Sequence, residues 1–159
     1  MTRVLFVCLG NICRSPLAQG MMEYHLQRAG LGDRVRVDSA GTAAYHTGEP
    51  PDERAIEAAA RRGFDISRQR ARQVQCSDIE AFDYICAMDL DNLAALNARC
   101  PGVNDARLGL LMDFSPGPAG QEVPDPYYGG EDGFEHALDL IESAVEGLVQ
   151  EIRSHLPLS

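Results

Sequence analysis

Hydrophobic and polar positions follow two different periods along this chain, and each change of period indicates a new strand or helix. A nearly continuous apolar run at residues 3–7 predicts a strand buried on both faces, as in a parallel sheet. Apolar residues at helical spacing then predict a helix over residues 16–29, with Ser15 as its N-cap and Gly30 at its end. The first predicted unit is therefore a strand, a short loop and a helix.

The same two periods alternate through the rest of the chain. Further strands are expected at residues 35–38, 82–88 and 107–112, and further helices at residues 51–62, 89–100 and 133–155. Strands that alternate with helices predict an α/β fold with a parallel sheet, here as one domain over residues 1–159. Ligands of such sheets bind beyond the carboxyl ends of the strands, which is where residues 8–15 follow the first strand.

Composition narrows the classes of function. The chain has 24 acidic and 14 basic residues, a net charge of -10, which argues against binding nucleic acid because phosphate affinity comes mainly from cationic side chains. Its apolar runs are far shorter than the roughly 20 residues that span a bilayer, so we expect no membrane insertion. The five cysteines have no framework spacing and the first residues show no signal-peptide pattern. We therefore expect a cytoplasmic protein with reduced thiols.

The segment CLGNICRS, residues 8–15, has the composition of an anion-binding loop. Gly10 permits close backbone approach and Asn11 tolerates a left-handed conformation, so that successive N–H groups can point inward. The start of the following helix adds its positive end, and Arg14 adds a fork of donors that matches phosphate. We expect a pocket for a tetrahedral dianion.

Cys8 lies at the floor of this expected pocket. A thiol at a helix N-terminus beside an arginine is expected to be a thiolate at neutral pH, able to attack phosphorus and form a cysteinyl-phosphate. Two other interpretations remain: Cys8 is a small core residue at a strand end, or the loop binds phosphate without reacting. The combination of Cys, five residues, Arg and Ser between a strand and a helix favours catalysis.

Cleavage of a phosphate ester also needs a proton for the leaving oxygen, and Asp125 is the candidate donor. It stands between Pro124 and Pro126, which restrict the backbone around it. Tyr127 and Tyr128 follow and can form an aromatic wall for a flat substrate. The alternative is a turn aspartate beside two partly packed tyrosines.

Four motifs together resemble one known family. VCLGNICRSP, DSAGT, FDYI followed by Met-Asp, and DPYYG occur in this order over essentially the whole chain, which resembles the low-molecular-weight protein tyrosine phosphatases of the bacterial type. The resemblance implies a flavodoxin-like, three-layer domain with a four-stranded parallel sheet. It also implies hydrolysis of phosphotyrosine monoesters through a phosphocysteine intermediate, without metal or cofactor.

By position, the resemblance makes Cys8 the nucleophile, Arg14 the clamp on the transferring phosphoryl group, and Asp125 the general acid and then base. Ser15 would hydrogen-bond the thiolate, and Asn11 with Ser39 would support the unusual backbone of the loop. The wall of the substrate cleft would be formed by Leu9, Tyr45, Tyr127 and Tyr128, and the phosphate-binding loop completed by Gly10, Ile12 and Cys13.

Other positions give weaker expectations. In the family, Cys8 and Cys13 can close a reversible disulfide that protects the nucleophile, and a role of Cys13 in loop packing is compatible with this. Gln19 and Gln69 stand where many eukaryotic members have Glu and His, so a network built on those residues is expected to be absent. The four histidines show no ligand spacing and no recognisable acid partner, so they are expected at the surface or on helix faces.

Three other functions compete with phosphotyrosine hydrolysis. Protein-arginine phosphatases resemble this chain but carry a threonine where Ile12 stands, and an apolar side chain suits an aromatic ring better than a cation. Arsenate reductases need a relay of cysteines that the wide spacing of Cys76 and Cys86 does not provide. A non-catalytic phosphate-binding module has no use for Asp125. The expected partner is a phosphotyrosine-containing protein and, if the chain is bacterial, a tyrosine kinase of the polysaccharide-export type.

Overall fold

A four-stranded parallel sheet forms the centre of the computed structural model, which describes residues 1–101, 108–128 and 130–156 except for the side chains of residues 128 and 131. The strands are β1 (Thr2–Cys8), β2 (Val35–Gly41), β3 (Tyr84–Ala87) and β4 (Leu108–Leu110), in the order β2-β1-β3-β4. This is the flavodoxin-like order, with the crossover point beside β1. The predicted fold class is confirmed.

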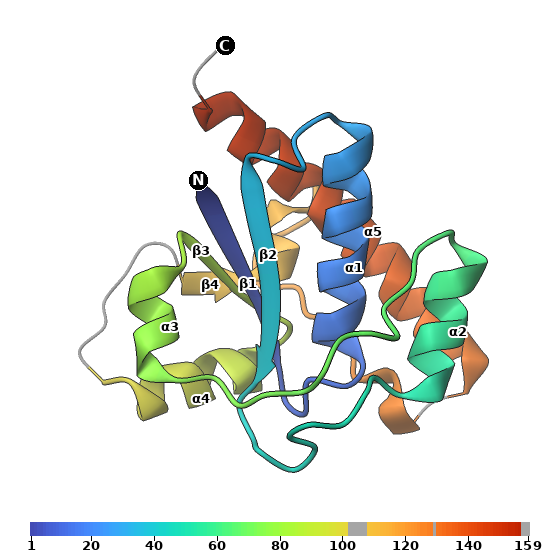
Figure 1. The fold of residues 1–159 in the computed structure, drawn as a ribbon. Coiled ribbons are helices and arrows are strands. Elements are labelled where there is room, and N and C mark those ends of the chain that lie inside the picture. The colour runs from blue at the N-terminus through green and yellow to red at the C-terminus, as the bar shows by residue number, and fades with distance from the viewer. Residues whose placement is uncertain (102–107, 129, 157–159) are drawn as a thin grey trace.

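Helices cover both faces of the sheet (Figure 1). The helices are α1 (Arg14–Arg28), α2 (Glu53–Arg61), α3 (Cys76–Ala81), α4 (Leu90–Arg99) and α5 (Glu131–His155). Because successive strand residues face opposite ways, Val4 and Phe6 pack in the core with α1 and α5, whereas Leu5 and Val7 pack in the core with α3 and α4. The two cores confirm the three layers.

Element boundaries differ from the predictions where side chains and pairing override the local pattern. β2 continues to Gly41 because each of its residues pairs with β1 as far as Cys8. The sequence analysis did not predict α3, a short helix held by a capping box between Gln75 and Asp78. The last predicted strand is shorter than expected and turns into a 3-10 helix, η1 (Leu111–Phe114), while its predicted first residue, 107, lies outside the described residues.

The expectation that all cysteines are reduced thiols is wrong for two of them. Cys76 and Cys100 form a disulfide, with their Cα atoms 5.6 Å apart and a separation of 24 positions in the chain. It joins the first residue of α3 to the C-cap of α4, two helices on the same face of the sheet. Cys8, Cys13 and Cys86 are free and buried.

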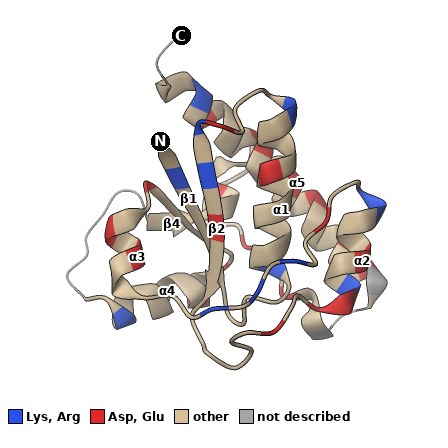
Figure 2. Cartoon of the chain, viewed as in Figure 1, with Lys and Arg blue, Asp and Glu red and all other residues tan. Residues whose placement is uncertain are grey.

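Figure 2 shows basic and acidic positions on α2 and on the neighbouring α5. Arg62, just after α2, lies 2.8 Å from a carboxylate oxygen of Glu135 and 2.8 Å from one of Asp139, both on α5. These ion pairs connect the end of α2 to α5. Within the described residues, none of the helices combines the length and the apolar character that a membrane span requires.

Candidate active site

The loop between β1 and α1 lies at the carboxyl end of the central strand. β1 ends at Cys8, and α1 begins at Arg14 after an N-cap, Cys13, whose side chain makes no capping bond. The first turn also contains no acidic residue. The N-terminus of α1 therefore keeps unpaired donors and an uncompensated positive end, both of which favour an anion.

Ser15 is not the N-cap that the sequence predicted, because its hydroxyl is used elsewhere. The Ser15 Oγ atom lies 3.0 Å from the Cys8 Sγ atom, and it accepts a hydrogen bond of 2.8 Å from the Asn11 side chain. The backbone N–H of Asn11 donates to the same sulfur at 3.2 Å. The sulfur therefore has one backbone N–H donor, that of Asn11, and the Ser15 hydroxyl within hydrogen-bond distance.

Asn11 holds the loop in its conformation. Its φ is 58°, the left-handed region that the sequence analysis expected. Its amide group donates to the Ser39 Oγ atom at 3.0 Å and accepts from the backbone N–H of Arg72 at 3.0 Å. Asn11 and Ser39 thus contact each other, as expected of residues that support the loop. The backbone of Arg72, in the segment before α3, also bonds to Asn11.

Gln19 and Gln69, which stand where many eukaryotic members have Glu and His, make hydrogen bonds of their own beside the loop. The Ser39 hydroxyl donates to the Gln19 Oε1 atom at 2.7 Å, and the Gln69 Nε2 atom donates to the carbonyl of Pro16 at 3.1 Å. Gln19 therefore contacts Ser39, which supports the loop, and Gln69 contacts the first turn of α1. An amide oxygen, like a carboxylate oxygen, can accept a hydrogen bond from a serine hydroxyl.

The sheet also needs a glycine beside this loop. A Cβ atom on Gly41 would lie 2.7 Å from the carbonyl oxygen of Leu9, a distance that real Cβ atoms essentially never show. Gly41 pairs with Cys8 across the two strands. The glycine of the DSAGT motif is thus required for the loop to approach the end of β2.

Arg14 is buried and fixed by groups from two other segments. Its Nη1 atom donates to a carboxylate oxygen of Asp89 at 2.6 Å and to the carbonyl of Val123 at 2.9 Å. Burial opposes its charge, but the neighbouring Cys8 sulfur and the Asp89 carboxylate raise the pKa of Arg14 nonetheless. The guanidinium is therefore charged and oriented before any ligand arrives.

Asp89 is a site residue that the sequence analysis placed only at the start of the helix expected over residues 89–100. It does cap α4, where it accepts from the backbone N–H of Asn92 at 2.7 Å, and its second oxygen holds Arg14. The available signal was its place two residues after the end of β3, at the edge of the sheet where the loop after β1 also lies.

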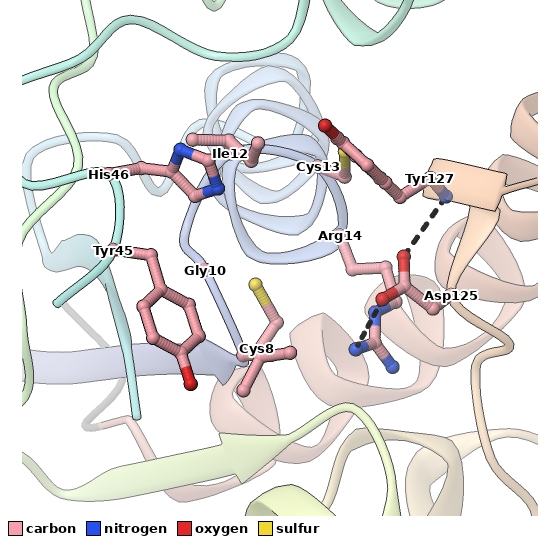
Figure 3. A pocket seen from close by; sticks show the side chains of 10 residues that line it. Cys8, Gly10, Ile12, Cys13, Arg14, Tyr45, His46, Asp125 and Tyr127 are labelled. Atoms are coloured by element: carbon pink, nitrogen blue, oxygen red, sulfur yellow. Dashed lines mark hydrogen bonds and ion pairs between the residues drawn. The ribbon is translucent and has the colours of Figure 1, made fainter. Parts of the chain in front are cut away.

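The loop and its neighbours line a cavity of about 190 Å³ (Figure 3). Its lining residues are Cys8, Leu9, Gly10, Ile12, Cys13, Arg14, Tyr45, His46, Asp125 and Tyr127. Nearly all the predicted site residues thus meet in one place, whereas Asn11, Ser15 and Ser39 support the loop. The side chain of Tyr128, predicted for the cavity wall, lies outside the described residues.

The walls of the cavity differ in character. Figure 3 shows Tyr45 on one side and Asp125 with Tyr127 on the other, with the Cys8 sulfur between them. A carboxylate oxygen of Asp125 lies 3.7 Å from the Arg14 Nη2 atom, and its other oxygen accepts from the backbone N–H of Tyr127 at 3.0 Å. Two aromatic side chains and a carboxylate thus flank a buried sulfur and a guanidinium.

His46 is the lining residue that the sequence analysis did not predict. Its Nδ1 atom lies 2.5 Å from a carboxylate oxygen of Glu49, so the expectation that the histidines lack acid partners is wrong here. It is wrong also for His25 beside Glu142 and His155 beside Glu151. Spacing of three residues in a loop gave no reason to pair His46 with Glu49.

Cys13 is a free thiol at the cavity, close in sequence to the free thiol of Cys8. Burial raises the pKa of the Cys13 thiol well above its ordinary value, with further contributions from Asp52 and Cys8. Cys13 therefore stays protonated at neutral pH. The reversible disulfide between the two remains a prediction.

A cysteine and an arginine at the two ends of such a loop, on a flavodoxin-like sheet, are typical of the cysteine-dependent phosphatases. Comparison with known proteins agrees. A family model described as low molecular weight phosphotyrosine protein phosphatase matches residues 3–157. The low molecular weight protein-tyrosine-phosphatase of Streptomyces coelicolor is 43% identical over 157 residues, which cover 97% of this chain and 95% of that protein.

Two solved structures are similar over nearly the whole chain. YfkJ from Bacillus subtilis has a TM-score of 0.93 and 38% identity, covering 99% of this chain and 98% of that one. A protein tyrosine phosphatase from Entamoeba histolytica with Hepes in its active site has a TM-score of 0.91 and 42% identity, covering 97% of this chain and 98% of that one. The chain therefore belongs to the low molecular weight phosphotyrosine protein phosphatase family, whose members are hydrolases.

Proposed function

We propose that this protein hydrolyses phosphotyrosine in proteins by way of a cysteinyl-phosphate, with Cys8 as nucleophile, Arg14 as phosphate clamp and Asp125 as general acid and base. The observation that carries the proposal is the environment of the Cys8 sulfur. Two hydrogen-bonding groups and a buried guanidinium surround it at the floor of an open cavity. A sulfur held in this way is a nucleophile aimed at whatever anion Arg14 binds.

In the first step, the Cys8 thiolate attacks phosphorus and the ester P–O bond breaks. The electron pair of that bond goes to the phenolic oxygen, which takes a proton from Asp125. The loop N–H groups and Arg14 stabilise the charge on the equatorial oxygens. The position of Asp125 at the cavity wall, beside Arg14, suits a group that must meet the leaving oxygen.

In the second step, a water molecule attacks the phosphocysteine and gives its proton to Asp125. The P–S bond breaks, its electron pair returns to the Cys8 sulfur, and inorganic phosphate leaves. Asp125 is then protonated and the thiolate restored, so one cycle consumes one water. Asp89 takes part as a positioning residue, because its carboxylate accepts a hydrogen bond from Arg14 while Asp89 itself is not among the residues that line the cavity.

The lining favours phosphotyrosine over the other candidates. Tyr45 and Tyr127 offer aromatic faces, and Ile12 offers an apolar one, where a phenyl ring would lie. Arsenate reduction is disfavoured because Cys76 is tied to Cys100, and burial raises the pKa of the Cys86 thiol to about 12. A protein-arginine phosphatase would share the same catalytic steps and differ only in the side chains that contact the substrate group bearing the phosphate.

We further infer a single domain over residues 1–159, a cytoplasmic location, and a phosphotyrosine protein as partner, with a tyrosine kinase as the candidate if the source is bacterial. The match to the family model over residues 3–157 supports the domain assignment. A reversible Cys8–Cys13 disulfide would protect the nucleophile Cys8 from over-oxidation.

The test compares kcat/KM on a phosphotyrosine peptide and on the same peptide with phosphoarginine. We expect a strong preference for phosphotyrosine, loss of turnover in Cys8→Ser, and a fall of about 10²- to 10⁴-fold in Asp125→Asn. Cys86→Ala and Asp113→Asn are matched controls that remove a thiol and a carboxylate outside the cavity. Preference for phosphoarginine would overturn the substrate, and full binding without turnover would support a phosphate-binding module instead.

A further inference from the structure

Three ligand-forming side chains meet between α1 and α5, far from the cavity of Cys8. His25 lies on α1, and Glu142 and Glu146 lie one turn apart on the same face of α5. Their possible ligand atoms all lie within 4.8 Å of one another. His25 comes 11 positions after Arg14, or about 16 Å along the helix, so this cluster is separate from the proposed active site.

The chemistry of the cluster fits a transition-metal ion. Imidazole nitrogens and carboxylate oxygens are both Zn²⁺ ligands, and three protein ligands with a water in the fourth position form a tetrahedral zinc site. Bonds of about 2.0 Å in that geometry place neighbouring ligand atoms about 3.3 Å apart. The His25 Nε2 atom and a carboxylate oxygen of Glu142 are 3.2 Å apart, so these two need almost no movement to share one ion.

The third ligand has room to complete the set. Glu146 is exposed and has a long side chain, so a change of rotamer can bring its carboxylate to the ion at little cost. It also lines an adjoining cavity of about 320 Å³ together with His25, which gives solvent and ions a path to both residues.

Arg62 orients one of the carboxylates from the other side. Its Nη1 atom lies 3.6 Å from the Glu142 Oε1 atom, while the Glu142 Oε2 atom faces His25. A partner that holds the far oxygen of a carboxylate ligand directs its near oxygen to the ion. Arg28 and Arg153 line the adjoining cavity. Their positive charge repels a cation, so the affinity of the site for a metal ion is lower than it would be beside neutral side chains.

We propose that His25, Glu142 and Glu146 bind a divalent transition-metal ion of the zinc type, which pins the C-terminal half of α1 to α5. Among the described residues, this is the one group of three or more such side chains whose ligand atoms lie this close together. His155 and Glu151 form a similar pair, 2.8 Å apart on the last turns of α5, and serve as an internal comparison with two ligands only.

The test is a titration of the protein with Zn²⁺, followed by NMR of the ring C–H signals of the four histidines. We expect the signals of His25 to move first, and those of His155 only at about tenfold higher Zn²⁺ or more, since one ligand fewer weakens a site by at least that factor. An ion that binds only the folded state also raises Tm. We expect that rise in the wild type and in His155→Gln, and its loss in His25→Gln and Glu146→Gln.

Two results would overturn the proposal. One is a rise in Tm that persists in His25→Gln. The other is a rise that disappears in Cys8→Ser, which would place the ion on the active-site thiol. Neither result bears on the phosphatase reaction, because the readouts are ring signals and Tm rather than turnover.

Discussion

Replacement of Asn11 tests the link between the backbone of the loop and its side-chain support. The side chain makes hydrogen bonds with the Ser15 hydroxyl, the Ser39 hydroxyl and the backbone N–H of Arg72, and only 2% of the residue is exposed. At about 1 kcal/mol net for each hydrogen bond, their loss costs about 3 kcal/mol of the free energy of unfolding. Both Asn11→Ala and Asn11→Gly remove them.

The two variants differ in a second contribution to stability, the conformational energy of residue 11, whose backbone is left-handed with φ 58°. Alanine adds a penalty of about 1 kcal/mol there, whereas glycine does not. We therefore expect a total loss of about 4 kcal/mol for Asn11→Ala and about 3 kcal/mol for Asn11→Gly, measured by urea unfolding. In both, kcat/KM on a phosphotyrosine peptide should fall at least tenfold, which corresponds to about 1.4 kcal/mol of lost transition-state stabilisation.

Asn97→Ala, at an exposed position of α4, is the control and should stay within about 0.5 kcal/mol of the wild type. Equal stability of the alanine and glycine variants would refute the reasoning about the backbone. A loss below about 1 kcal/mol in both would refute the reasoning about the hydrogen bonds.

Three further predictions concern the scaffold. Cys76→Ser removes the disulfide across 24 positions and should lower the free energy of unfolding by about 3.5 kcal/mol in urea, while reductant should have the same effect on the wild type. Gly147→Ala should lower Tm in a thermal scan despite alanine's higher helix propensity, because its Cβ atom would clash with the carbonyl oxygen of Phe114; a higher Tm would contradict this packing. The hydrogen bond from Arg54 lowers the pKa of Asp52 below its ordinary value of 3.8, so the stability that this charge contributes is present above that value and is lost as pH falls through the folded-state pKa. Asp52→Asn should therefore be less stable than the wild type at pH 7 and equal to it in acid, as measured by urea unfolding across pH; a constant gap would contradict the assignment.

Much of the fold was predictable because its elements are long and periodic. The buried run of β1, the apolar face of α5 and the loop of residues 8–15 are each visible in a single stretch of sequence. The flavodoxin-like type of sheet came from the resemblance to a family, since no local pattern states which strands are neighbours. The prediction of a parallel α/β fold needed only the alternation of strands and helices.

The sequence analysis missed features that depend on contacts between distant segments. Ser15 has the composition of an N-cap, but its hydroxyl bonds to Cys8 and Asn11 instead. Cys76 and Cys100 lie far apart in the chain, and only the packing of α3 beside α4 brings them together. The second role of Asp89, as the partner of Arg14, likewise follows from the adjacency of β1 and β3.

The covalent intermediate is the most direct test of the proposed reaction. A phosphotyrosine peptide would be mixed with the protein, the reaction quenched within one turnover, and the digested protein analysed by mass spectrometry. We expect one phosphoryl group on the peptide that contains Cys8, and none on that peptide in Cys8→Ser. Hydrolysis of the substrate with the phosphoryl group on another residue, or with none on the protein at any time within the turnover, would contradict the role of Cys8.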